Sequence, residues 1–180
     1  MHVDIKTHRV TATITGIKDP TDIAVTEDAV WVANHRDDTV TRIDPLTNKI
    51  VALVSLGTTS SNPNCRSCVS GVAIGAGAVW VSVAVGGVVR IDPQTNQVVT
   101  IIPTNAGTFG IASDDQGIWF ANGEDQAILR IDPLTNQIVG AIPSSAPLAF
   151  LVSGEGALWA TTDFSDAQAR NKVIRFDKQP

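Results

Sequence analysis

The residue of this chain best suited to acid–base chemistry is His35, which lies in a polar stretch beside Arg36. Histidine titrates near neutral pH, so with a carboxylate in reach it can move a proton to or from a bound substrate. Glu124 and Asp163 occupy corresponding polar stretches and are the carboxylates that could complete such a pair. The other two histidines lie at positions 2 and 8, outside any corresponding stretch. We therefore assign no catalytic residue from the sequence.

The second chemical candidate is the pair Cys65 and Cys68, the only cysteines of the chain. Two cysteines are too few for a disulfide framework, and a zinc site would need two further thiolate or imidazole ligands. We expect a local disulfide in an oxidising compartment. Two free thiols in a loop, or a metal site that pools four cysteines across a dimer, are the alternatives. No metal ligand and no cofactor is assigned.

These residues lie between the strands of a sequence repeat. Each copy has a tryptophan inside a short apolar run, then a polar gap, then a second run that contains arginine and ends in aspartate. The four tryptophans are 49, 39 and 40 positions apart: Trp31, Trp80, Trp119 and Trp159. A period near 40 residues that is built from short strands and turns is typical of a β-propeller.

Each repeat is consistent with four antiparallel strands, which we name A to D and which are rich in valine and isoleucine. In the first repeat they are expected at 22–25, 30–33, 39–43 and 49–54. Between strands C and D, Pro45 presets φ for a type I turn and Asn48 can adopt the left-handed conformation that closes it. Two later repeats have the same turn residues: Pro93 with Asn96 and Pro133 with Asn136. The sequence therefore predicts an all-β fold, a β-propeller of four-stranded antiparallel blades with four repeats per chain.

The repeated tryptophans and arginines each have two interpretations. The tryptophans could form an aromatic platform for a sugar, but their identical place in strand B favours packing between blades. Each arginine stands one apolar residue before an aspartate: Arg42, Arg90, Arg130 and Arg175. We interpret the arginines as a structural ladder, with an anion-binding ring of cations as the alternative.

The two ends of the chain complement each other. Residues 3–14 align with 43–54 and are expected to form a strand D without its own A, B and C, whereas the last repeat ends at a strand C over 172–177. Because an open sheet edge is an aggregation hazard, we expect the N-terminal strand to close the last blade, in its own chain or in a partner chain. The single domain, 1–180, then divides into a closing outer strand at 1–15 and blades at 16–55, 56–103, 104–143 and 144–180.

The number of blades in the finished ring has three interpretations. The residues expected between blades are small, which suits blades packed at shallow angles, as in rings of six to eight. We therefore expect a homodimer that forms an eight-bladed ring. A closed four-bladed monomer and a piece of a longer propeller are the alternatives.

Composition excludes several classes of protein. Hydrophobic residues make up 43% of the chain and charged residues 17%, which excludes a disordered tail. The net charge is -5 and lysine and arginine are not clustered, so we expect no nucleic-acid partner. No apolar run approaches the ~18 residues that a membrane-spanning helix needs. The first residues lack the apolar centre of a signal peptide.

The repeats resemble the YVTN-type propeller repeats of bacteria and archaea. The resemblance rests on a strand B that reads Trp31-Val32-Ala33-Asn34 and on a strand C that ends in Ile43-Asp44, and it covers nearly the whole chain. The chain is also similar to the streptogramin (virginiamycin B) lyase propellers. That resemblance implies an alternative activity, a lyase with a histidine–carboxylate pair and a divalent metal, although Asn122 stands where those lyases usually have glutamate.

Function is expected at the links between strands B and C and between consecutive blades, because loops on a rigid scaffold concentrate binding residues. We predict a non-catalytic binding module, extracytoplasmic (periplasmic or secreted), that takes an unknown protein or small-molecule ligand on this face. Simple solvation of polar loops is the alternative interpretation. The expected residues of the face are His35, Arg36, Asp37, Glu124, Asp125, Asp163, Asp166 and Arg170.

Overall fold

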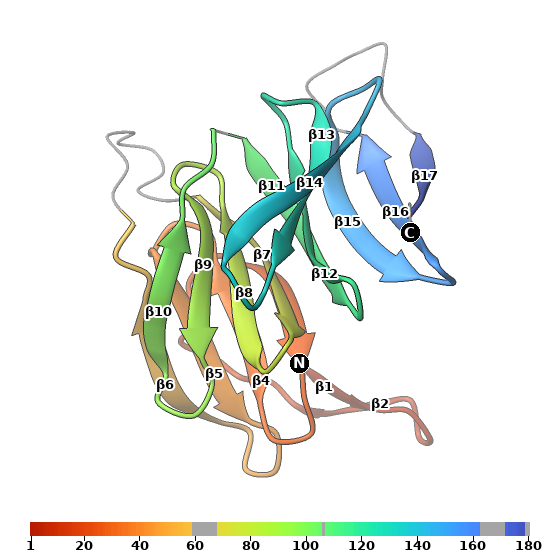
Figure 1. Ribbon diagram of the computed structural model, residues 1–180. Coiled ribbons are helices and arrows are strands. Elements are labelled where there is room, and N and C mark those ends of the chain that lie inside the picture. Colours follow the sequence, from red (N-terminus) through yellow and green to blue (C-terminus); the bar gives the residue numbers. More distant parts are fainter. Residues whose placement is uncertain (59–67, 106, 163–171, 179–180) are drawn as a thin grey trace.

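The computed structural model describes residues 1–58, 68–105, 107–162 and 172–178. All regular structure in these residues is β, in four successive antiparallel sheets and one N-terminal hairpin (Figure 1). Blade 1 consists of β3 (Pro20–Val25), β4 (Val30–Asn34), β5 (Thr39–Asp44) and β6 (Lys49–Ser55). Blade 2 consists of β7 (Val69–Gly75), β8 (Ala78–Val83), β9 (Gly87–Asp92) and β10 (Gln97–Ile102). Blade 3 consists of β11 (Thr108–Asp114), β12 (Gly117–Asn122), β13 (Ala127–Asp132) and β14 (Gln137–Pro143).

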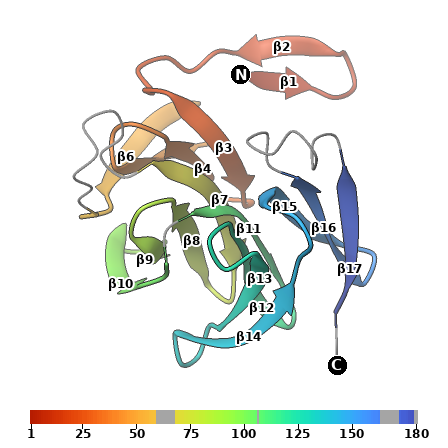
Figure 2. The ribbon, with the colours of Figure 1, turned by 90° about the horizontal axis from the view of Figure 1, so that it is seen from above.

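Blade 4 has three described strands, β15 (Leu148–Gly154), β16 (Ala157–Thr162) and β17 (Val173–Asp177). Strands within each blade pair in chain order, so β3, β7, β11 and β15 are the strands A and lie innermost (Figure 2). The predicted all-β propeller of four antiparallel blades is confirmed. No helix in the described part of the chain could cross a membrane.

The turns between strands C and D form as their residues predict. The Oδ1 atom of Asp44 accepts hydrogen bonds from the backbone N–H groups of Leu46 and Thr47 at 2.8 and 3.1 Å. Asn48 closes the turn at φ 56°, a conformation that asparagine tolerates better than most residues. Asn96 and Asn136 occupy the same place at φ 58° and 56°. These short turns set the register of the outer strands.

Close approach of the innermost strands requires residues without large side chains. A Cβ added to Gly75 would lie 2.6 Å from the Cβ of Ser113 on β11, and one added to Gly110 would lie 2.4 Å from the backbone nitrogen of Leu151 on β15. Both distances are shorter than real contacts, so only glycine fits. Small residues therefore bring neighbouring blades together, as the sequence indicates.

The tryptophans of the first three blades are packing residues. Trp31, Trp80 and Trp119 are almost completely buried, and each carries the guanidinium of the strand C arginine of its own blade over its ring at 5.1 to 5.6 Å. Such cation–π contacts add to the burial of the ring. These contacts support the packing interpretation over a sugar platform.

The arginines also join neighbouring blades. Arg42 Nη1 of blade 1 donates to the carbonyl oxygen of Pro93 at 2.9 Å and to Asn96 Oδ1 at 3.0 Å, both in the turn between strands C and D of blade 2. Arg90 repeats the contact with the next turn, at 2.9 and 2.7 Å. We call this contact the arginine clasp. Its acceptors are parts of the protein, which supports a structural role over anion binding.

The N-terminal segment differs from the single closing strand that the sequence suggests. It folds back into the hairpin of β1 (His2–Asp4) and β2 (Arg9–Ala12), because Asp4 Oδ1 accepts hydrogen bonds from the N–H groups of Lys6 and Thr7 and His8 closes the turn at φ 54°. Within the described residues of one chain, neither strand pairs with β17. Closure of the last blade by a strand of the same chain is therefore not seen.

Candidate binding face

The links expected to bind a ligand gather at one end of the blades and are joined by backbone hydrogen bonds. Each bond joins a turn between strands B and C to the segment that enters the same blade or the next blade. In order they are His35 N to Asp19 O, Val69 N to His35 O, Ala84 N to Cys68 O, Gly107 N to Ala84 O and Gly123 N to Gly107 O, at 2.7 to 3.2 Å. We call this end of the molecule the linked face. These bonds fix the backbone from which the side chains of the face project.

His35 connects blades 1 and 2 on the linked face. Its Nδ1 atom lies 3.0 Å from the carbonyl oxygen of Val69, and its backbone bonds both Val69 and Asp19. The side chain is half-buried. His35 thus links the segment that enters blade 1 to the first residue of β7 in blade 2.

Arg36 and Asp37 occupy the turn that follows β4 and carry opposite charges. Arg36 Nε lies 3.4 Å from Asp19 Oδ2, and Lys18 Nζ lies 3.1 Å from Asp37 Oδ2. Exposed pairs of this kind contribute about 0–1 kcal/mol to stability, so these groups can exchange partners at little cost. The sequence interpretation missed Lys18 and Asp19, which precede β3 and reach the face only through the fold.

Glu124 and Asp125 occupy the corresponding turn of blade 3, and both are exposed. Asn122 Oδ1 accepts the backbone N–H of Asp125 at 2.9 Å, and Asn105 Nδ2 donates to Asp125 Oδ1 at 2.9 Å. The asparagine that departs from the lyase pattern thus shapes this turn. Beside Asp125 lies a hollow of about 340 Å³, which the following residues line: Pro103, Thr104, Asn105, Asp125, Leu129 and Ile138.

The two groups of expected residues share a face but do not form one cluster. Blade 2 separates them, and among the described residues no hydrogen bond or ion pair joins Arg36 or Asp37 to Glu124 or Asp125. No group of three or more His, Cys, Asp or Glu side chains in the described ranges could hold a metal ion. The face therefore offers separate polar groups rather than one compact reaction centre.

Four of the residues named from the sequence lie outside the described residues: Asp163, Asp166, Arg170 and Cys65. Cys68 is described and is disulfide-bonded, which agrees with the expected disulfide.

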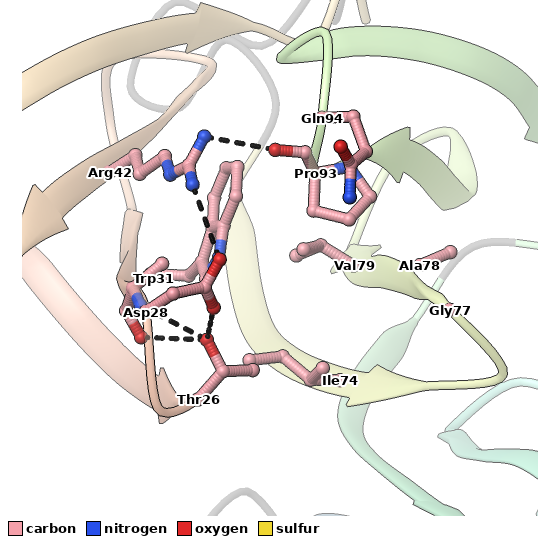
Figure 3. Close-up of a pocket in the computed structure, with 11 residues that line it drawn as sticks. Thr26, Asp28, Trp31, Arg42, Ile74, Gly77, Ala78, Val79, Pro93 and Gln94 are labelled. Atoms are coloured by element: carbon pink, nitrogen blue, oxygen red, sulfur yellow. Dashed lines mark hydrogen bonds and ion pairs between the residues drawn. The ribbon is translucent and has the colours of Figure 1, made fainter.

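A second cleft opens at the opposite end of blades 1 and 2, with a volume of about 350 Å³ (Figure 3). Arg42 and Trp31 of blade 1 face Pro93 and Gln94 of blade 2 across the cleft (Figure 3). The exposed Asp28 also lines it, with its carboxylate 3.7 Å from the Arg42 guanidinium. The hydrogen bond from Thr26 is the largest of the causes that lower the pKa of Asp28, and the charge of Arg42 acts in the same direction. Because Arg42 is held in the arginine clasp, this cleft is part of the joint between blades.

A buried ion pair joins blades 3 and 4 at this same end. Lys178 Nζ lies 2.6 Å from Asp114 Oδ2, with the two side chains 8% and 11% exposed. Ser153 donates to the same oxygen, and Trp119 Nε1 donates to Asp114 Oδ1. Burial raises the pKa of Asp114, but the hydrogen bonds from Lys178, Trp119 and Ser153 outweigh it, so the pKa lies below its usual value.

Comparisons with known proteins show the fold. No protein-family model and no curated protein matches the sequence. Among solved structures, hydrazine synthase of Kuenenia stuttgartiensis superposes with a TM-score of 0.74 at 21% identity, over 93% of this chain and 48% of that one. The computationally designed Ika4 protein superposes at 0.68 and 15% identity, over 92% of this chain and 96% of that one. The WD40 repeats of RRP9 superpose at 0.65 and 13% identity, over 89% and 51%.

The chain is a β-propeller. It spans about half the length of the hydrazine synthase and RRP9 chains and nearly all of the Ika4 chain. At these identities the comparisons show the propeller fold alone, and the function must be argued from the site.

Proposed function

We propose that this propeller is a non-catalytic binding module that takes a protein or small-molecule partner on the linked face. One observation carries the proposal. The turns and entry segments of blades 1, 2 and 3 are joined by a continuous series of backbone hydrogen bonds. The backbone that presents the polar side chains is therefore held in place before a partner arrives, which lowers the cost of ordering on binding.

The chemistry of the face suits a partner with polar groups of both signs. Blade 1 presents Lys18 and Arg36 with their aspartates, whereas blade 3 presents Glu124 and Asp125 beside a hollow. The acidic turn of blade 3 would attract a basic group, and the hollow would admit the side chain or ligand that carries it. The fold shared with WD40 repeats is compatible with this role.

Three further parts of the proposal extend the sequence interpretation. We assign the repeats to the YVTN type on the motif around each tryptophan. We place the protein outside the cytoplasm, because Cys68 is disulfide-bonded and disulfides persist in oxidising compartments. We also take the functional unit to be a pair of chains, for which the contacts are derived in the next subsection.

The test compares two double variants. Glu124→Lys with Asp125→Lys changes the linked face, and Glu27→Lys with Asp115→Lys makes the same charge change at turns between strands A and B, at the opposite end of the blades. Partners cross-linked to the purified protein in extracts of its source are identified and then titrated as purified components. The face variant should weaken binding by at least about tenfold, ~1.4 kcal/mol, while the control binds like the wild type. The proposed face is contradicted if both double variants bind the partner as tightly as the wild type does, or if both lose the same amount of affinity.

The lyase alternative has its own measurement. Thermal unfolding is recorded with Mg²⁺, Mn²⁺ or Zn²⁺ for the wild type and for His35→Ala. A metal-dependent rise in Tm that is lost in His35→Ala would favour the enzyme over the binding module. Equal responses of the two proteins favour the binding module.

A further inference from the structure

Blade 1 has an apolar face that no other blade covers in the described residues. Ile23 on β3 is 59% exposed, although the residues at its position in the other three blades are 4 to 5% exposed: Val72, Ile111 and Leu151. These four residues are equivalent because each one pairs with the residue that directly follows the tryptophan on strand B of its own blade. In blades 2 to 4 this position packs against the preceding blade. Among the described residues, no blade packs on this face of blade 1.

Blade 4 has the complementary open face. Trp159 is 36% exposed, against 0 to 4% for the other three tryptophans, and Val152 is 61% exposed, against 7% for Ala73 and Ala112 at its position. Strands A of successive blades pack together in the first three steps, but β15 and β3 show no comparable packing in the described residues. The two open faces are thus the two sides of an interface that occurs three times inside the chain.

The N-terminal hairpin identifies what belongs on the open face of blade 1. Its register matches that of β5 with β6, because Asp4 pairs with Arg9 as Asp44 pairs with Lys49. The register also shifts at the same place in both hairpins, between His2 and Val3 in one and between Arg42 and Ile43 in the other. His2 therefore occupies the place of Arg42. Its Nδ1 atom lies 3.3 Å from Asn48 Oδ1, the acceptor that corresponds to Asn96 in the arginine clasp.

The hairpin is accordingly the outer ribbon of a blade that would precede blade 1. It leaves a pocket of about 560 Å³ against blade 1, with His2, Val3, Ile23, Val25 and Ile43 among the residues that line it. β1 stands in the place of a strand C, and the strand C of blade 4 has matching residues, since His2-Val3-Asp4 corresponds to Arg175-Phe176-Asp177 of β17.

We infer that the open face of blade 1 binds blade 4 of a second copy of this chain, with β17 of that copy taking the place of β1 and pairing with β2. In this composite blade, β2 is the fourth strand beside the three described strands of blade 4. Arg175 of the second copy replaces His2 and donates to the Pro45 carbonyl oxygen and to Asn48 Oδ1, which forms an arginine clasp between blade 4 of one copy and blade 1 of the other. The inference gives the contacts of the pair of chains that forms part of the proposed function.

The partner is a second copy rather than the chain's own last blade because of how the blades pack. Glycines bring the strands A into close contact, and the four blades of one chain leave Ile23 and Trp159 uncovered. A second copy covers both open faces of each chain at once. Two such heterologous contacts related by a two-fold axis close a ring of eight blades.

The first experiment measures the molar mass of the full chain by light scattering during size exclusion. The expected mass is twice the 19.0 kDa of one chain. Val152→Glu, on the open face of blade 4, should give single chains. The control is Val99→Glu on the outer strand β10, which should leave the mass doubled. The two side chains are similarly exposed, Val152 at 61% and Val99 at 55%. A wild-type mass of one chain, a mass beyond two chains, or equal effects of the two variants overturns the proposal.

The second experiment separates the contacts. Arg175→Ala should raise the dissociation constant of the pair at least tenfold, because the clasp at Asn48 is lost. His2→Ala should leave it unchanged or lower it, because β1 is displaced in the pair. If His2→Ala weakens the pair as much as Arg175→Ala does, the hairpin stays intact and the strand exchange is wrong.

A third measurement separates a second copy from closure within one chain. Of the four tryptophans, only Trp159 is substantially exposed in the single chain, so acrylamide quenching of fluorescence reports on it. Quenching should fall as the protein concentration rises in the wild type and should stay high in Val152→Glu. Low quenching at every concentration with a single-chain mass overturns the proposal. None of these measurements uses the linked face. Binding of a partner on the linked face can therefore be disproved while the pairing of chains holds, and the pairing can be disproved while that binding holds.

Discussion

Gly110 shows how one residue can control the packing of two blades. The position that a Cβ would take at Gly110 is 2.4 Å from the backbone nitrogen of Leu151, and backbone cannot move aside as a flexible side chain can. The residue is therefore glycine because of a close approach, and not because of a turn. Gly154, at the end of β15, has no atom within 4 Å of the corresponding position.

We expect Gly110→Ala to destabilise the protein by about 1–3 kcal/mol, the usual cost of adding atoms to a tightly packed site. Gly154→Ala is the control and should change stability by less than about 1 kcal/mol, since the added methyl meets no neighbour. Urea unfolding of both variants measures the difference. Equal effects would mean that blades 3 and 4 are less closely packed than described.

Asp114 is the second residue whose environment sets a measurable property. Its folded pKa lies below the unfolded value, because hydrogen bonds from Lys178, Trp119 and Ser153 favour the charged form more than burial disfavours it. A carboxylate with a depressed pKa stabilises the fold above its unfolded pKa of about 3.9, and this contribution is lost as the pH falls through the folded pKa.

Asp114→Asn should therefore cost about 3 kcal/mol near neutral pH, because it leaves Lys178 buried without its counter-charge. The gap between wild type and variant should shrink as the pH is lowered below about 4. Asp115→Asn, at the exposed neighbouring position, should change stability by no more than about 0.5 kcal/mol. The measurement is unfolding free energy against pH. A gap that does not change with pH would contradict the role of the Asp114 charge.

Among the elements, the turn between strands C and D has two functions that only the packing of blades reveals. Within its own blade it fixes the register through Asp44 and Asn48, and the sequence predicts this much from residue types. Across blades, the same type of turn in blade 2 supplies the carbonyl and amide oxygens that bind Arg42. The second function depends on residues about one repeat apart, so strand patterns cannot indicate it.

We expect Arg90→Lys to destabilise the protein by about 1–2 kcal/mol, because an ammonium cannot keep both the stacking on Trp80 and the two bonds to the next turn. Arg130→Lys is the matched control. Arg130 stacks on Trp119 but donates only at 3.4 Å to Gln116 of its own blade. Thermal or urea unfolding should show the larger loss for Arg90. The reverse order would contradict the clasp between blades.

For the whole molecule, assembly should make thermal stability depend on concentration. If the ring contains two chains, mass action raises Tm as the protein concentration increases. Val152→Glu, which places a charge on the open face of blade 4, should have a Tm that does not change with concentration. Val99→Glu should behave like the wild type. A wild-type Tm that is constant over a wide range of concentration would contradict assembly.

The sequence predicted the positions of some residues of the linked face. The sequence placed His35, Arg36, Asp37, Glu124 and Asp125 on turns of one face, because those turns follow strand B in every repeat. It did not identify their partners Lys18, Asp19 and Asn105, since these lie in segments without a repeated pattern. The ion pair of Asp114 with Lys178 was also missed, because it joins residues of two different blades.

The sequence by itself determined the repeat, the strands, the turns and the packing role of the tryptophans. Each of these depends on residue types within a few positions of one another: alternating apolar residues, a proline with an asparagine, and a tryptophan at a constant place. Only the tertiary structure decided which blade faces stay open and that the N-terminal segment is a hairpin with His2 in the place of an arginine. These properties depend on how closely one sheet can approach the next, which is set by atoms far apart in the chain.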